Sequence, residues 1–122
     1  MIAPLILLVD DEYDVLTSYA MLFEYSGFRV QTASNGADAL KVAASAPPDI
    51  VLSDFMMPVM DGGRFCLAWE ADATLRDIPF ILTSAGVVQH HDLPYDCYFK
   101  KPVRFELLMT EIHRLLALRR PS

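Results

Sequence analysis

Short apolar runs of this sequence end, one after another, in side chains that can take part in phosphate chemistry. These side chains are Asp10, Asp11, Asp54, Ser84 and Lys101. The run Ile50–Leu52 has the composition of a strand buried on both faces, and it stops at Ser53, so Asp54 stands at a strand end and faces a loop. Open α/β sheets bind their ligands at the carboxyl ends of the strands. We therefore predict that Asp54 is a nucleophile that carries a phosphoryl group.

The acidic residues after the first and third runs predict a divalent cation. If these two strands are neighbours, Asp10, Asp11 and Asp54 converge, and three close carboxylates repel one another unless a cation compensates them. Oxygen ligands, retained waters and a phosphate oxygen suit Mg²⁺. We expect Asp11 as a direct ligand, Asp10 as a second, water-mediated one, and the backbone carbonyl of Met56 as a third. A helix cap is the alternative role of Asp11 and the expected role of Asp61.

The remaining strand ends supply the other parts of a phosphoryl-transfer site. Asp54 would attack phosphorus to form an acyl phosphate, while the Lys101 ammonium and the metal neutralise the developing charge. Ser84 can donate its hydroxyl to a phosphoryl oxygen, and its inward movement would leave space for Tyr98 to fill. An ordinary packing role in a strand is the alternative for Tyr98.

The elements that must position these residues alternate between strand and helix patterns. Apolar runs and alternation predict strands at 5–9, 28–32, 50–52, 80–83 and 97–100. Helical spacing predicts helices at 13–25 and 37–45, around Phe65–Trp69, and from Phe105 to Leu116. The stretch 87–96 has few apolar residues and contains Pro94, so we expect at most a short helix there. Right-handed β-α repeats then give a three-layer α-β-α parallel sheet.

Length, charge and cysteine content limit the classes of function. A chain of 122 residues has room for one domain, which we expect to span 1–122. The net charge of -6 at pH 7 argues against sequence-independent binding of nucleic acid. Without a basic leader or a bilayer-length apolar run, the protein is expected to be cytoplasmic. Cys66 and Cys97 should be free thiols, and Cys97 with His90 and His91 lacks the ligands for a zinc site.

Four motifs, in this order, resemble the signature of the receiver domain of two-component response regulators. They are VDDE (Val9–Glu12), SDFMMPVMDG (Ser53–Gly62), Ser84–Ala85 and Lys101–Pro102. The resemblance covers nearly the whole chain and implies a flavodoxin-like (βα)5 fold with strand order 2-1-3-4-5. For the site it implies Asp54 as phospho-acceptor, Asp10 and Asp11 as acidic metal pair, Met56 as carbonyl ligand, Ser84 as switch hydroxyl and Lys101 as phosphoryl-contacting lysine. It also implies a cis peptide bond at Lys101–Pro102.

The resemblance further implies a phosphohistidine donor on a histidine kinase or a histidine phosphotransfer protein. The protein would then be a signalling receiver and not an enzyme with turnover, since it would catalyse only its own phosphorylation and slow dephosphorylation. Its output partner stays open, as does a phosphorylation-linked homodimer. The alternative is a receiver-like module that binds partners without phosphorylation. A phosphohydrolase would need a general acid beside Asp54, where the sequence has Phe55 and Met56.

Two details of the sequence are ambiguous with respect to the family pattern or differ from it. Thr83 and Ser84 both carry hydroxyls; the spacing from Pro79 favours Ser84 as the switch hydroxyl and leaves Thr83 at a position that is usually apolar. In the same way, Pro102 favours Lys101 over the lysine before it. The stretch between the switch hydroxyl and the lysine is shorter than usual in the family. We therefore expect the fourth helix to be short or absent, which puts the usual output face in doubt.

Overall fold

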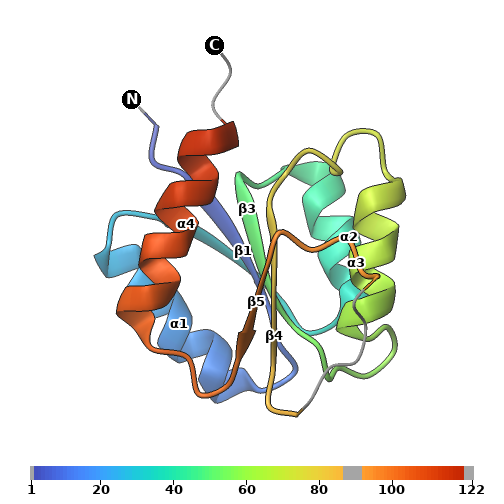
Figure 1. The fold of residues 1–122 in the computed structure, drawn as a ribbon, viewed down its shortest axis with the longest axis horizontal. Helices are drawn as coiled ribbons and strands as arrows, with labels where there is room; N and C mark the ends of the chain where they lie inside the picture. Colours follow the sequence, from blue (N-terminus) through green and yellow to red (C-terminus); the bar gives the residue numbers. More distant parts are fainter. Residues whose placement is uncertain (1, 87–91, 120–122) are drawn as a thin grey trace.

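The structure is a computed structural model that describes residues 2–86 and 92–119. In chain order its elements are β1 (Leu5–Val9), α1 (Tyr13–Tyr25), β2 (Arg29–Ala33), α2 (Gly36–Ser45), β3 (Ile50–Asp54), α3 (Gly62–Ala71), β4 (Phe80–Ser84), β5 (Cys97–Lys100) and α4 (Phe105–Arg119). The strands form one parallel sheet in the order β2-β1-β3-β4-β5. Helices α1 and α4 cover one face and α2 and α3 the other (Figure 1). The three-layer fold and strand order expected from the sequence are confirmed.

The sequences of the strands explain their places in the sheet. All five residues of β1 and of β3 are buried, as expected for central strands that have helices on both faces. Strand β2 exposes Arg29 and Thr32 and lies at an edge. In the ladder Val9 pairs with Ser53, and Asp54 pairs with Thr83. The carboxyl ends of β1, β3 and β4 are therefore level at one edge of the sheet.

Each face of the sheet has its own apolar core. Beneath α2 and α3, Phe65, Trp69 and Phe80 form a ring cluster with centroids 5.2–6.1 Å apart. Beneath α1 and α4, Phe23 contacts Phe105 with centroids 5.2 Å apart. Because neighbouring residues of a strand face opposite sides, the three central strands β1, β3 and β4 each contribute to both cores.

Two strands run further than their apolar residues indicate. The sequence predicts ends at Leu52 and Thr83, but β3 includes Asp54 and β4 includes Ser84. The additional residues are paired in the ladder, Asp54 with Thr83 and Ser84 with Lys100. The polar residues at this edge are therefore held by the sheet and do not belong to a loop.

The connection between β4 and β5 contains no helix in its described parts, 85–86 and 92–96, as the short spacing predicts. The prediction for 87–91 lies outside the described residues. Leu93 and Tyr95 pack against the core beneath α3. Asp96 accepts a hydrogen bond from the Phe80 N–H at 2.7 Å and donates its own N–H to the Phe80 carbonyl at 2.8 Å. The helix labelled α4 is thus the predicted C-terminal helix.

Both cysteines are free thiols, as predicted. Burial raises the pKa of the Cys66 thiol to about 12.

Within the described parts of the chain, no helix combines the length and apolar character that a membrane span requires.

Candidate functional site

A polar layer lies at the carboxyl edge of the sheet, on the side of α1. Leu8, Leu52 and Ile81 belong to the core on this face. Two residues further along the three strands, the same face presents Asp10, Asp54 and Thr83, because side chains alternate along a strand. Asp10 is 5% and Asp54 6% exposed. The strand alternation therefore places two buried carboxylates directly above an apolar core.

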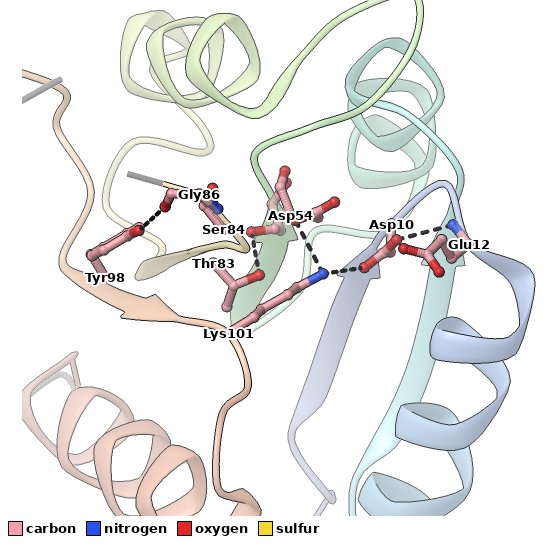
Figure 2. Close-up of polar contacts among 9 residues, drawn as sticks. Asp10, Glu12, Asp54, Thr83, Ser84, Gly86, Tyr98 and Lys101 are labelled. Atoms are coloured by element: carbon pink, nitrogen blue, oxygen red, sulfur yellow. Dashed lines mark hydrogen bonds and ion pairs between the residues drawn. The ribbon is translucent and has the colours of Figure 1, made fainter. Parts of the chain in front are cut away.

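Lys101 provides the positive charge between these two carboxylates. Its Nζ lies 3.3 Å from Asp10 Oδ2 and 3.2 Å from Asp54 Oδ1 (Figure 2). The Lys101 N–H donates a hydrogen bond to the Ser84 carbonyl at 2.8 Å, and this bond fixes the backbone position from which the side chain extends. The Lys101–Pro102 peptide bond is cis, as implied by the resemblance. One ammonium group thus joins the ends of β1, β3 and β5.

The charges of this site depend on one another. Burial raises the pKa of the Asp54 carboxyl; the charge of Lys101 opposes this and the charge of Asp10 adds to it. For Lys101, burial favours the neutral amine, but the two carboxylates together outweigh burial and raise its pKa. Lys101 is therefore a cation at neutral pH. The Asp54 anion is more costly here than in water, and a further cation would stabilise it.

Oxygen donors for such a cation lie beside Asp10. Carboxylate oxygens of Asp10, Asp11 and Glu12 lie within 4.8 Å of one another, and Asp10 Oδ1 accepts a hydrogen bond from the Glu12 N–H at 3.0 Å. This all-oxygen set, with Asp11 and Glu12 exposed to solvent, fits Mg²⁺, which keeps several waters. Asp11 does not cap α1: Glu12 holds the N-cap position, and no side chain caps the helix.

The loop from Asp54 to α3 ends in a side-chain helix cap and contains one residue with an unusual backbone conformation. Asp61 caps α3, as predicted, by accepting a hydrogen bond from the Arg64 N–H at 2.8 Å. Val59 has a φ of 66°, in the left-handed region that β-branched residues rarely adopt. The Met56 side chain is 65% exposed. The role of the Met56 carbonyl as a metal ligand stays a prediction.

Gly62 lets this loop pass close beneath Asp54, and replacing it by alanine should destabilise the protein. A Cβ atom at Gly62 would lie 2.5 Å from the Asp54 carbonyl oxygen and 2.6 Å from the Phe55 Cα. Backbone atoms cannot yield as a flexible side chain does, so we expect Gly62→Ala to lower the free energy of unfolding by about 2–3 kcal/mol in a urea titration. Gly86→Ala is the matched control, because a Cβ there meets nothing within 4 Å. Equal stability of the two variants would contradict this.

Hydroxyl groups at the end of β4 have separate partners. Ser84 Oγ accepts a hydrogen bond from the Gly86 N–H at 3.2 Å, and the Tyr98 hydroxyl donates to the Gly86 carbonyl at 3.2 Å. Thr83 Oγ1 donates to the Ser53 carbonyl at 3.4 Å. Figure 2 shows Tyr98 pointing to Gly86 and Thr83 lying beside Lys101. Tyr98 and Ser84 are therefore both hydrogen-bonded to Gly86 through their hydroxyl groups.

Comparison with known proteins decides the family. The model of the response regulator receiver domain matches residues 6–113. The chain belongs to this family. The receiver domain is 35% identical over 117 residues to the response regulator SaeR of Staphylococcus aureus, in a match covering 91% of this chain and 50% of SaeR. The chain therefore spans about half the length of the curated relatives it matches.

Solved structures agree with this assignment. The signal receiver domain of a signal transduction histidine kinase from Syntrophus aciditrophicus is 26% identical with a TM-score of 0.90, and the match covers 98% of this chain and 95% of that one. The chemotaxis response regulator CheY4 of Vibrio cholerae is 24% identical with a TM-score of 0.83, over 93% and 98% of the two chains. The second likeness concerns the fold alone.

The structure of the receiver domain brings only some of the predicted residues into contact. Asp10, Asp54 and Lys101 form one charged group, and Asp11 lies beside Asp10. Ser84 lies at the same edge of the sheet, with its hydroxyl engaged by a backbone N–H. The sequence analysis did not single out Glu12, although the VDDE run was a visible signal for it.

Tyr19 is a second residue near the site that the sequence analysis missed. It lies on α1 and lines a small cavity together with Asp10 and Asp54. Burial raises the pKa of its hydroxyl. Helical spacing alone marks Tyr19 as one more core residue, so the sequence offers no separate signal for its place beneath the site.

Proposed function

We propose that this receiver domain accepts a phosphoryl group on Asp54 from a phosphohistidine of a histidine kinase or histidine phosphotransfer protein. The observation that carries the proposal is the ammonium of Lys101 at 3.3 Å from Asp10 and 3.2 Å from Asp54, two buried carboxylates from different strands. A buried acidic pair with its own cation at a strand end is suited to hold and neutralise a phosphoryl group. In this proposal residues 1–122 act as one cytoplasmic signalling domain without substrate turnover.

The transfer step requires a nucleophile and neutralisation of charge. A carboxylate oxygen of Asp54 attacks phosphorus, an O–P bond forms and the P–N bond breaks, and the histidine nitrogen leaves with the electron pair of that bond. Lys101 already contacts Asp54 and can donate to a phosphoryl oxygen. Asp10, Asp11, Glu12 and Asp54, with the Met56 carbonyl, would hold Mg²⁺, which supplies further neutralisation of phosphoryl charge.

The response to phosphorylation begins at Ser84. Its hydroxyl, now an acceptor for the Gly86 N–H, would turn to donate to a phosphoryl oxygen. That turn removes the hydrogen bond of the Gly86 N–H, while the Gly86 carbonyl still accepts from the Tyr98 hydroxyl. A change at the acceptor thus reaches β5 and alters the surface that a downstream partner contacts.

Metal dependence is the direct test of this proposal. The purified chain is incubated with Mg²⁺ and acetyl phosphate, a small phosphodonor, and its intact mass is measured. We expect a mass increase of one phosphoryl group with Mg²⁺ and no increase when EDTA replaces the metal, because the acidic pocket then lacks charge compensation. An intact mass that stays unchanged in Mg²⁺ would overturn the proposal.

A further inference from the structure

Thr83 is the uncharged member of the polar layer that it forms with Asp10 and Asp54. It is the ladder partner of Asp54, and it is 4% exposed. Among the described residues, its hydroxyl makes one hydrogen bond, to the Ser53 carbonyl, and that bond is long at 3.4 Å. A buried hydroxyl usually has strong partners, and this one still has both lone pairs available to accept.

A small cavity is lined both by the polar layer and by apolar residues of the core beneath α1. Its polar walls are Asp10, Asp54, Thr83 and Tyr19, and the others are apolar. The space available to the centre of a water molecule is about 10 Å³. That is about the smallest space that holds one water, and a buried water needs two to four polar partners, which these walls provide. The cavity therefore has room and polar partners for one water molecule.

We propose that Thr83 is a positioning residue for the acceptor carboxylate, acting through one water bound in this cavity. This inference rests on the proposed function of Asp54. The Thr83 hydroxyl donates to the Ser53 carbonyl and accepts from the water, and the second hydrogen of the water is donated to the Asp54 carboxylate. With Lys101 on one oxygen of Asp54 and the water beneath, the carboxylate is held in one orientation before the donor arrives.

The Tyr19 hydroxyl completes the set of partners. Among the residues that the structure describes, it has no hydrogen bond of its own. It can donate to the oxygen of the water, which leaves both water hydrogens for Thr83 and Asp54. Ser84 cannot take the place of Thr83, because the next residue along a strand faces the other side of the sheet. The two hydroxyls at the end of β4 thus serve different faces of the site.

A set of three variants tests the proposal. Thr83→Val removes the hydroxyl at nearly constant shape, Thr83→Ser keeps it but loses a methyl group, and Thr32→Val makes the same exchange on the exposed edge strand β2. The initial rate of phosphorylation by acetyl phosphate in saturating Mg²⁺ and the urea midpoint of unfolding are measured for each. If Thr83 mattered only for packing, the phosphorylation rates of the variants would fall in the same order as their urea midpoints.

We expect rate and stability to rank the variants in opposite order. Thr83→Val should be phosphorylated about tenfold more slowly than the parent, equivalent to about 1.4 kcal/mol in the barrier, and yet unfold at no lower urea concentration than Thr83→Ser. Thr83→Ser and Thr32→Val should keep the parent rate. Parent-like phosphorylation of Thr83→Val, or a Thr83→Ser rate as low as that of Thr83→Val, would overturn the role of Thr83. A parent protein that takes up no phosphate would instead overturn the proposed function.

Discussion

Asp54→Asn is expected to abolish the phosphoryl adduct while leaving the protein folded. The amide has nearly the shape of the carboxylate but lacks the anionic oxygen that attacks phosphorus. Intact mass after incubation with acetyl phosphate and Mg²⁺ is the measurement. Asp49→Asn is the matched control, because Asp49 uses its carboxylate to accept the Leu5 N–H at 2.7 Å before β3 begins, at the far edge of the sheet. A phosphorylated Asp54→Asn protein would show that another residue is the acceptor.

The same variant has an expected effect on the pH dependence of stability. Burial raises the pKa of Asp54 in the folded protein, so the folded state binds this proton more tightly than the unfolded state. The contribution of Asp54 to stability is then present at low pH and is lost as the pH rises from the unfolded pKa through the raised one. Without metal, the advantage of Asp54→Asn in urea unfolding should therefore grow over that range and stay constant above it.

Lys101→Met is expected to slow phosphorylation by about a hundredfold, the size of effect seen when one electrostatic contact to a developing charge is removed. The methionine keeps the length of the apolar stem but leaves Asp10 and Asp54 without their shared cation. Because Lys101 is partly exposed, we expect a loss of only about 1–2 kcal/mol of stability in metal-free buffer. Mg²⁺ should restore part of it, so the rise in melting temperature on adding Mg²⁺ should exceed that of the parent.

The neighbouring lysine is the control for this experiment. Lys100 is exposed, and no ion pair of Lys100 occurs among the described residues. Lys100→Met should therefore keep the parent rate and the parent response to Mg²⁺. Equal losses in the two variants would contradict the assignment of Lys101, which the sequence made only from the following proline.

The fold could be predicted because its signals are local. Continuous apolar runs marked the central strands, and helical spacing marked α1 to its last residue. The strand ends were predicted too early, because ladder pairing continues through Asp54 and Ser84 although the apolar composition stops. Sequence patterns show where side chains become polar, whereas the backbone hydrogen bonds that extend a strand depend on its neighbour.

The site was predictable in its members but not in its contacts. Residue type and strand position identified Asp10, Asp54 and Lys101. The sequence did not show which of the two hydroxyls, that of Thr83 or that of Ser84, lies on which face of the sheet. This depends on the register of β4 against β3. Tyr19 lines a cavity together with residues from β1, β3 and β4 or their ends, and no spacing along the chain encodes that.

The connection between β4 and β5 is held at both of its ends: Asp96 bonds Phe80 at the start of β4, and Tyr98 of β5 bonds Gly86, two residues after β4 ends. On this side of the molecule, the rings of Tyr95 and Tyr98 lie 6.0 Å apart between centroids. Both rings pack against the core beneath α2 and α3, so the flank of the edge strand β5 is built by an aromatic pair that the core anchors.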